Sequence, residues 1–283
     1  MKIGLVKLYR KNNIKEKNFL KNFIMNLTYN YKFDINKVWK EENQNNIFYV
    51  MNFNEKSQEK LRNLLRKNQI DYVIVENSKN IEYKTLNGKI VMKYILSNII
   101  DKIRKETEKE ISEVSVCVNK YNEEIKEIIK ELANNVKVVN VVTNNENFFD
   151  FEKELEQKDI FITVSTNKRK ALRKAELMIN VDIENIKEFN LNKKLIIINL
   201  NDEMIYPKSF EGIIINSVEL STKKIMRIVA ENPNFQKTKL IEKEILELNN
   251  IDKIKKYIRI NRIEIKTLNN KNMKYEFERI KND

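Results

Sequence analysis

The sequence has no histidine, 1 cysteine, 3 glycines and 2 prolines among its 283 residues. Without histidine, the chain has no imidazole to act as a general base, to bind a metal or to activate a serine or cysteine nucleophile. The single cysteine, Cys117, excludes an internal disulfide and a cysteine-based zinc site. It lies within an apolar run, so we interpret it as a buried thiol and not as a nucleophile.

Long hydrophobic runs are also missing. The longest apolar stretches, such as Leu195–Ile198, are much shorter than the ~20 residues that a membrane-spanning helix needs. The first residues alternate in polarity and are followed closely by lysine and asparagine, unlike a secretory signal peptide. We therefore expect a soluble cytoplasmic protein without a membrane partner, which the scarcity of cysteine also favours.

The chain is basic, with a formal net charge of +13 from 54 lysines and arginines and 41 acidic residues. An excess of positive charge attracts polyanions such as nucleic acid. The acidic residues are interspersed with the basic ones, so no block of one sign dominates the sequence. Two explanations stay open: a background composition that keeps the protein soluble, or a binding site for a polyanion.

Residues 1–110 are predicted to form a small α/β domain that ends in a long helix. The expected strands are Lys2–Leu8, Ile47–Phe53 and Asp71–Glu76, and the expected helices are Ile14–Leu27 and Glu55–Asn68. The stretch Tyr29–Gln44 has no clear period, which indicates a loop with a short helix. After a turn at Asn87-Gly88, apolar residues at three-to-four spacing predict one connecting helix, Lys89–Lys109, with the domain boundary near Glu110.

Residues 111–232 are predicted to form a Rossmann-like domain with a parallel sheet. Apolar β-branched runs alternate there with helical patterns, which is typical of parallel strands joined by crossover helices. The expected strands are Glu113–Val118, Val136–Val142, Ile160–Val164, Leu177–Val181, Leu195–Leu200 and Gly212–Val218. Ser221-Thr222 is expected to cap a further helix, Lys223–Ala230.

Residues 233–283 are predicted to form a helix, Phe235–Leu248, and then a basic β-hairpin with strands Ile263–Leu268 and Met273–Phe277. Cations and aromatic residues interleave in this last part: Arg259, Arg262, Lys266, Lys271, Lys274 and Arg279 with Tyr257, Tyr275 and Phe277. Such a surface suits single-stranded nucleic acid. Lysines on a hairpin also protect an edge strand from aggregation. As a further alternative, an exposed edge could pair with a second copy of the chain to make a homodimer.

Three stretches resemble the amino-acid-dehydrogenase-like enzymes, in particular shikimate dehydrogenase and glutamyl-tRNA reductase. They are the turn Thr85-Leu86-Asn87-Gly88 before the long helix, the β-α-β pattern Glu113–Val142, and the helix-to-strand passage Lys170–Asn180. The resemblance implies a small N-terminal catalytic α/β domain, a long helix and a Rossmann domain that binds a nicotinamide dinucleotide.

The chain departs from this pattern where those families carry their chemistry. The loop Asn119-Lys120-Tyr121-Asn122 has no glycine, so its side chains are expected to lie where a diphosphate would contact the backbone. Thr143-Asn144-Asn145 follows the second strand and supplies neither the acid nor the arginine of a dinucleotide ribose site. The Asn-Val-Thr-x-Pro-x-Lys signature of the shikimate site and the cysteine and histidine machinery of the reductase are missing too. We therefore expect no cofactor and assign no catalytic residue.

Polar residues follow three strands of the predicted sheet, at the carboxyl ends where α/β proteins bind ligands. They form a candidate crevice for a small anionic ligand: Asn119, Lys120, Thr143, Asn144, Ser165, Thr166 and Asn167. Ser165 or Thr166 is expected to cap the helix that follows. The alternative is that these segments are polar turns whose function is limited to capping helices.

Five cations lie in that helix: Lys168, Arg169, Lys170, Arg173 and Lys174. Cations beside a helix start suit a phosphate group or nucleic acid. The alternative is a solvated helix face opposite Ala171, Leu172 and Ala175, which would pack inward.

Three hypotheses for the function follow from these observations. The favoured one is a non-catalytic Rossmann-like protein that acts as a scaffold or as a sensor of a small ligand or nucleotide. The second is a divergent NAD(P)-dependent oxidoreductase that uses lysine, tyrosine or aspartate chemistry. The third is a nucleic-acid-binding protein that uses the basic cluster or the hairpin.

Overall fold

The computed structural model describes residues 1–8, 35–41, 46–53, 58–76, 81–187, 189, 191–192, 194–202, 204–205, 210–223, 229 and 236–270. Contacts group the chain into two units, Met1–Asn87 with Lys224–Glu247 and Gly88–Lys223 with Leu248–Asp283. The expected helix Ile14–Leu27, nearly all of the expected helix Lys223–Ala230 and the expected strand Met273–Phe277 lie outside the described residues.

The first unit contains a four-stranded sheet in the order β2-β3-β1-β4. Its elements are β1 (Lys2–Leu8), β2 (Ile35–Glu41), β3 (Asn46–Phe53), α2 (Gln58–Lys67), β4 (Tyr72–Glu76) and α9 (Lys237–Leu248). Strand β1 runs parallel to β3 and β4, and β2 runs antiparallel to β3. The predicted strands and the predicted helices 55–68 and 235–248 are therefore found, with small shifts of their ends.

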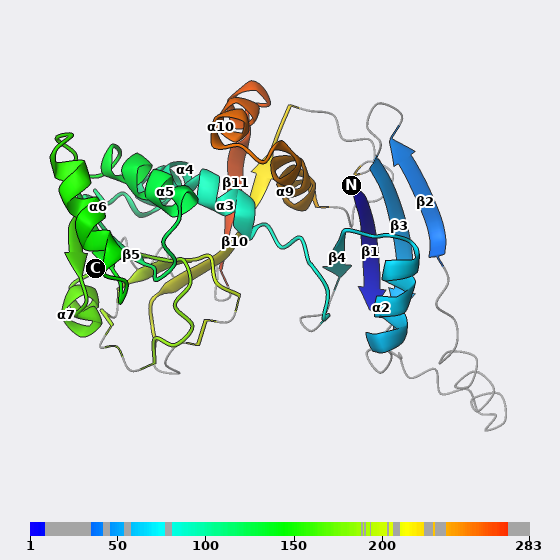
Figure 1. Cartoon of the computed structure of the whole chain (residues 1–283), viewed down its shortest axis with the longest axis horizontal. Helices are drawn as coiled ribbons and strands as arrows, with labels where there is room; N and C mark the ends of the chain where they lie inside the picture. The colour runs from blue at the N-terminus through cyan, green and yellow to red at the C-terminus, as the bar shows by residue number, and fades with distance from the viewer. Residues whose placement is uncertain are drawn as a thin grey trace. The chain divides into compact units, whose positions relative to one another are not determined.

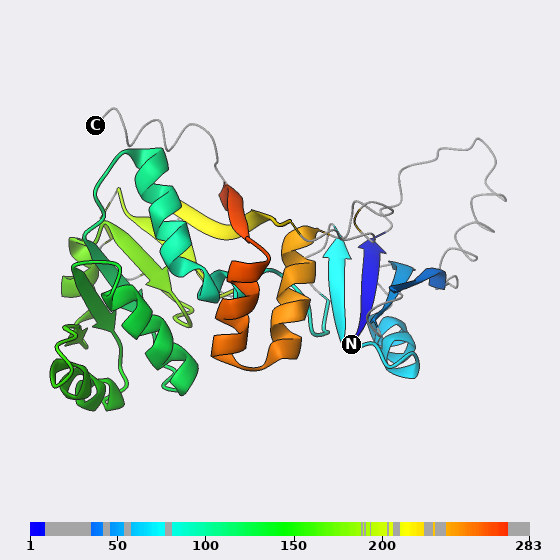
Figure 2. The same cartoon turned by 90° about the horizontal axis from the view of Figure 1, so that it is seen from above.

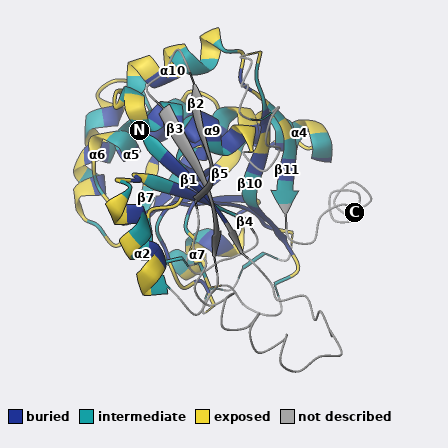
Figure 3. Ribbon diagram, turned by 90° about the vertical axis from the view of Figure 1, so that its right-hand side faces the viewer, coloured by how far each residue is buried: buried dark blue, intermediate teal, exposed yellow. Residues whose placement is uncertain are grey.

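Helix α2 packs on this sheet through an apolar stripe. Leu61 and Leu65 are fully buried and pack with Val6, Ile70 and Val73. The opposite side of the helix is exposed, as Figure 3 shows. The three-to-four spacing of the leucines thus predicts both the helix and its buried face.

The prediction of a loop with a short helix at Tyr29–Gln44 is wrong for residues 35–41, which form β2. The register between β2 and β3 shifts between Ile35 and Lys37, a bulge-type irregularity. Residues 37–41 pair regularly with β3, but their sequence, Lys-Val-Trp-Lys-Glu, lacks the alternation in polarity that identifies a strand. Pairing with β3 therefore determines this strand, although its local pattern does not.

The second unit contains a seven-stranded sheet in the order β11-β10-β9-β8-β5-β6-β7 (Figures 1 and 2). Its strands are β5 (Glu113–Cys117), β6 (Val138–Val142), β7 (Thr163–Ser165), β8 (Leu177–Asn180), β9 (Ile196–Asn199), β10 (Ile213–Ser221) and β11 (Glu264–Asn270). All neighbours pair in parallel except β10 and β11. The chain starts at β5, moves outward through β6 and β7, and returns to β8 on the other side. This is the strand order of a Rossmann fold, so the predicted fold class is confirmed.

Helices cover both faces of this sheet. They are α3 (Lys89–Tyr94), α4 (Leu96–Thr107), α5 (Glu123–Ala133), α6 (Asn147–Glu156), α7 (Lys168–Arg173) and α10 (Ile251–Ile260). In Figure 1, α4 and α5 run above the strands and α7 lies below them. On the α7 side, Leu172 packs in one core with Cys117, Met178 and Ile197 from three adjacent strands. Within the described ranges, no helix combines the length and apolarity needed to cross a bilayer.

The predicted turn at Asn87-Gly88 is found, and Gly88 has a φ of 88°, which favours glycine. The single helix predicted after it is wrong, because Ile95 leaves the helical region with φ −124° and ψ 21° and separates α3 from α4. Helix α3 contacts β10, and α4 contacts β11 and α5. By these contacts both helices group with the second compact unit, which begins at Gly88.

Two further expectations need correction. The strand expected at Ile160–Val164 is found later, at Thr163–Ser165, because β6 pairs with β7 solely over its last residues. Tyr257 and Arg259 lie in helix α10, which we did not predict, and not in a hairpin. The following strand, β11, pairs antiparallel with β10 of the main sheet.

Candidate functional site

The carboxyl ends of β5 and β8 meet at the centre of the seven-stranded sheet. From β5 the chain proceeds to β6 on one side, whereas β8 lies on the other side. Such a reversal of strand order is where open α/β sheets bind ligands. The segments that follow β5, β6, β7 and β8 therefore form the candidate site.

The turn after β5 is bonded to an aspartate from the turn after β8. The backbone N–H of Asn119 donates to Oδ1 of Asp182 at 2.8 Å, and the backbone N–H of Lys120 donates to Oδ2 at 2.7 Å. In a dinucleotide-binding protein, backbone N–H groups at this turn face the diphosphate. Here both groups are already bonded to a negatively charged group of the same chain, and hydrogen bonds to a charged acceptor are strong.

The turns after β5 and β6 are bonded to each other. Oδ1 of Asn119 accepts from the backbone N–H of Asn144 at 2.9 Å, and Nδ2 of Asn145 donates to the carbonyl of Asn119 at 2.9 Å. Thr143 is fully buried, and its Oγ1 accepts from the backbone N–H of Asn145. Three of the predicted crevice residues thus come together, but they are engaged with one another.

The side chains of Tyr121 and Asn122, in the same loop, contact the helices that follow it. The ring of Tyr121 packs edge-on against Phe148, with centroids 5.0 Å apart, and the ammonium of Lys126 lies 5.3 Å from its centroid. Oδ1 of Asn122 accepts from the backbone N–H of Ile125 at 2.9 Å and caps α5. The ring of Tyr121 thus packs against α6, whereas the Asn122 carboxamide occupies the start of α5, where a diphosphate would bind in a Rossmann domain.

The first turn of α5 carries negative charge of its own. Glu123 and Glu124 are its first residues. The Glu124 carboxylate accepts from the Tyr94 hydroxyl at 2.9 Å and from Nζ of Lys93 at 3.2 Å. Burial and the Glu124 charge raise the pKa of Tyr94 well above its usual value, so its hydroxyl stays a neutral donor. Acidic side chains complement the positive end of the helix, where a phosphate would otherwise be favoured.

A row of three asparagines joins the carboxyl-end region of β8, β9 and β10 through side-chain hydrogen bonds. Nδ2 of Asn180 donates to Oδ1 of Asn199 at 3.1 Å, and Nδ2 of Asn199 donates to Oδ1 of Asn216 at 2.9 Å. The main chain of Ile183 accepts from and donates to Asn180, which is fully buried. Nζ of the buried Lys89 donates to the carbonyl of Asn199.

We did not predict Asp182 or this asparagine row from the sequence. Each asparagine of the row follows three consecutive aliphatic residues, in Leu177–Asn180, Ile196–Asn199 and Ile213–Asn216. That repeated pattern was the available signal. For Asp182 there was no comparable signal, because its partners lie 62 and 63 residues away along the chain.

The segment after β7 is bonded within itself. Oδ1 of Asn167 accepts from the backbone N–H of Lys170 at 3.0 Å and caps α7. Oγ of Ser165 accepts from the backbone N–H of Asn167 at 3.2 Å. The expectation that Ser165 or Thr166 caps this helix is therefore wrong, because Asn167 has the position from which its carboxamide reaches the third residue of the helix.

Cys117 lies at the end of β5 beneath this site and is fully buried. Burial raises the pKa of its thiol to about 12, although the charge of Lys168 acts in the opposite direction. A thiol with such a pKa is protonated at neutral pH and is a poor nucleophile. The interpretation of Cys117 as a buried thiol is confirmed.

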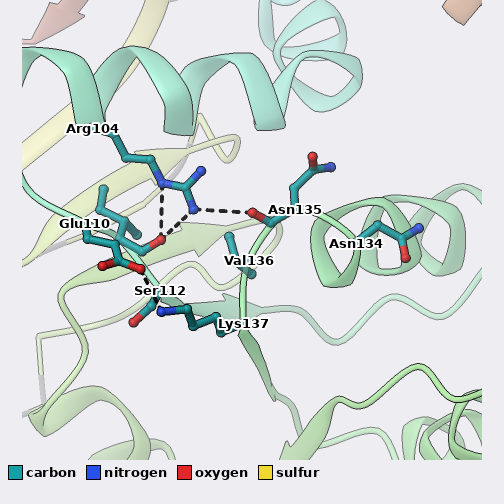
Figure 4. Close-up of a pocket in the computed structure, with 8 residues that line it drawn as sticks. Arg104, Glu110, Ser112, Asn134, Asn135, Val136 and Lys137 are labelled. Carbon is teal, nitrogen blue, oxygen red and sulfur yellow. Dashed lines mark hydrogen bonds and ion pairs between the residues drawn. The ribbon is translucent and has the colours of Figure 1, made fainter.

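A cleft of about 540 Å³ lies at the opposite, amino end of β5 and β6 (Figure 4). The guanidinium of Arg104 donates to the carbonyl of Ile111 at 2.6 and 3.2 Å and to the carbonyl of Asn135 at 3.3 Å. Nζ of Lys137 pairs with Glu110 at 2.7 Å. The cations of this cleft thus bond to neighbouring groups of the chain. Among the described residues, no group of three or more acidic or cysteine side chains is placed to hold a metal ion.

No protein-family model and no curated protein matches the sequence. Solved structures that are similar to it include L-tryptophan dehydrogenase from Nostoc punctiforme, at 13% identity and a TM-score of 0.33. The similarity covers 74% of this chain and 66% of that one, which is just under two thirds of its length. Shikimate dehydrogenase from Thermotoga maritima has 13% identity and a TM-score of 0.25, over 75% of this chain and 88% of that one. The A chain of dipicolinate synthase from Bacillus subtilis has 11% identity and a TM-score of 0.31, over 70% and 79%. The resemblance is weak, and it assigns no activity to this chain.

Proposed function

We propose that this chain is a non-catalytic Rossmann-like protein that acts as a scaffold, with a dinucleotide crevice closed by its own side chains. One observation carries the proposal, the pair of hydrogen bonds from Asn119 and Lys120 to the Asp182 carboxylate. A diphosphate would have to displace this carboxylate from both N–H groups and would meet its negative charge. Both effects oppose binding.

The contacts on either side of this turn support the same function. On the β6 side, Asn119 is bonded to Asn144 and Asn145, where the adenosine half of a dinucleotide would lie. On the β9 side, the amide of Asn199 is bonded to Asn201 and Asn216. A ligand would therefore have to break several internal hydrogen bonds along the carboxyl edge. The free energy lost with these bonds would offset the free energy gained from its own contacts.

Calorimetric titration of the full chain with NAD⁺, NADP⁺ and NADPH tests the proposal. We expect no binding heat, and no stabilisation by these compounds in thermal unfolding. A genuine cofactor at a hundredfold excess over its dissociation constant would raise the free energy of unfolding by ~2.7 kcal/mol. Saturable binding of any of them at micromolar concentration would overturn the proposal and favour the divergent oxidoreductase.

A further inference from the structure

Helix α7, which lies below the strands in Figure 1, carries a group of cations. This group, the α7 patch, consists of Lys168, Arg169, Lys170, Arg173 and Lys174. Lys168 is half-buried and the other members are exposed. The inner side of the helix is apolar, because Leu172 is fully buried and Ala175 is 2% exposed in the core below the sheet.

The α7 patch differs from the cations of the neighbouring helices. On α5, on α6 and just after α6, lysines pair with acids three or four residues away: Lys126 with Glu123, Lys130 with Glu127, Lys153 with Asp150, and Lys158 with Glu154. No member of the α7 patch forms an ion pair with any residue in the described ranges. From Ser165 to Glu176 the one acidic residue is Glu176, so the positive charge there is not neutralised locally.

We propose that the α7 patch binds the phosphate backbone of nucleic acid. Two of its members are arginines, whose planar guanidinium groups bind phosphates with paired hydrogen bonds, and its lysines add point charges. The net charge of +13 on the whole chain adds a long-range attraction to a polyanion. Backbone binding requires no aligned apolar contacts, since phosphate neutralisation and counterion release supply most of its affinity.

The chemistry of the patch favours nucleic acid over two other polyanions. An acidic membrane surface is best held by a helix that inserts an apolar side, but the apolar side of α7, with Leu172, packs in the core of its own unit. A protein partner typically needs buried aromatic or aliphatic anchors at the centre of the interface. The outer side of α7 offers charge alone.

Fluorescence anisotropy with a labelled oligothymidylate tests this proposal on the full chain. The test variant is R169Q/K170Q/R173Q, and the control is K137Q/K153Q/K158Q, which removes the same charge from lysines that are 73%, 72% and 56% exposed in ion pairs. At about 50 mM salt, where phosphate contacts are strong, we expect the test variant to lose about tenfold or more in affinity. The control should lose about twofold or less, since any effect of net charge alone is shared by both variants.

Salt dependence and conservative replacement distinguish phosphate contacts from a structural role. Each phosphate contact on a single strand contributes about 0.7 to the slope of log affinity against log salt, so the test variant should lose about 2 from this slope. The variant R169K/K170R/R173K should keep the binding. Undetectable binding by wild type, equal losses in test and control variants, or tighter binding of polyglutamate or phosphatidylserine vesicles would each overturn the proposal. None of these outcomes depends on whether the crevice binds a dinucleotide.

Discussion

The carboxyl edge of the seven-stranded sheet and the α7 patch lie in the same unit but differ in how their polar and charged groups are bonded. At the edge, Asp182, Asn119 and Asn180 are each bonded to groups of the chain itself. On α7, five cations find no acidic partner among the residues that the structure describes. A Rossmann fold normally binds its ligand at the first of these places. The difference teaches that the polar groups at the carboxyl edge stabilise the fold through bonds to each other. The cations that remain for binding a ligand lie on α7.

The largest effect should come from breaking the asparagine row. Asn180→Ala leaves the N–H and carbonyl of the buried Ile183 without the carboxamide to which they are bonded, and each such loss costs about 1–3 kcal/mol. It also removes one of the hydrogen bonds of the Asn199 carboxamide, which keeps its bonds to Asn201 and Asn216. We expect the free energy of unfolding to fall by about 3 kcal/mol in urea denaturation. Asn140→Ala is the matched control, because Asn140 lies on β6 with its side chain bonded at the surface to Glu113. Equal losses in both variants would mean that the row is no more structural than an exposed amide.

A smaller loss is expected at Asp182. Asp182→Ala removes the acceptor of two charge-assisted hydrogen bonds that connect the turns after β5 and β8. Because the site is partly exposed and water can replace the carboxylate, we expect a cost of about 2 kcal/mol. Asp150→Ala, in an exposed ion pair with Lys153, should cost less than about 0.5 kcal/mol. An unchanged midpoint for the Asp182 variant would show that its carboxylate is not bonded in solution.

The contact between α3 and α5 should contribute less, and its contribution should depend on pH. Tyr94→Phe removes one partly buried hydrogen bond to Glu124, which we expect to cost about 1 kcal/mol at neutral pH. The pKa of Tyr94 is raised above its ordinary value of 10.0, so the folded state binds this proton more tightly than the unfolded state. The contribution is thus complete below pH 10 and is lost as the pH rises above it. Urea denaturation of wild type and variant at pH 7 and above pH 10 would then give a difference that shrinks with pH, and a constant difference would contradict this account.

The smallest effect on stability should come from the α7 patch. Its members are exposed or half-buried and form no ion pairs with described residues, so R169Q/K170Q/R173Q should change the free energy of unfolding by no more than about 0.5 kcal/mol. Thermal unfolding measures this directly. If the free energy of unfolding fell by several kcal/mol, these cations would stabilise the fold as the polar groups of the carboxyl edge do. The contrast between the two regions would then be wrong.

Local pattern predicted much of the fold. Runs such as Ile196–Ile198 and Ile213–Ile215 are apolar and β-branched, so each indicates a buried strand whatever its neighbours are. Their alternation with helices predicted that the strands are parallel. By contrast, the break at Ile95 lies between apolar residues that continue the helical period, and residues 37–41 of β2 do not alternate in polarity. In both places tertiary packing determines what the local sequence does not.

The candidate site was predictable in part. The ends of apolar runs place Asn119, Thr143 and Ser165 at one edge of the sheet, and the missing glycines argue against a dinucleotide. Of the side chains expected in the way of a diphosphate, that of Tyr121 packs against Phe148 and that of Asn122 bonds to the start of α5. The Asp182 carboxylate, which bonds to the turn after β5, reaches this edge because β5 pairs with β8. No local sequence pattern encodes that pairing.

Amide hydrogen exchange at Asn119 and Lys120, followed by NMR, tests the central claim most directly. If the Asp182 carboxylate holds both N–H groups, their exchange should be slow in the wild-type protein, should accelerate in Asp182→Ala and should not respond to NADP⁺. Rapid exchange in the wild-type protein that slows when NADP⁺ is added would show an open dinucleotide site and would contradict the account.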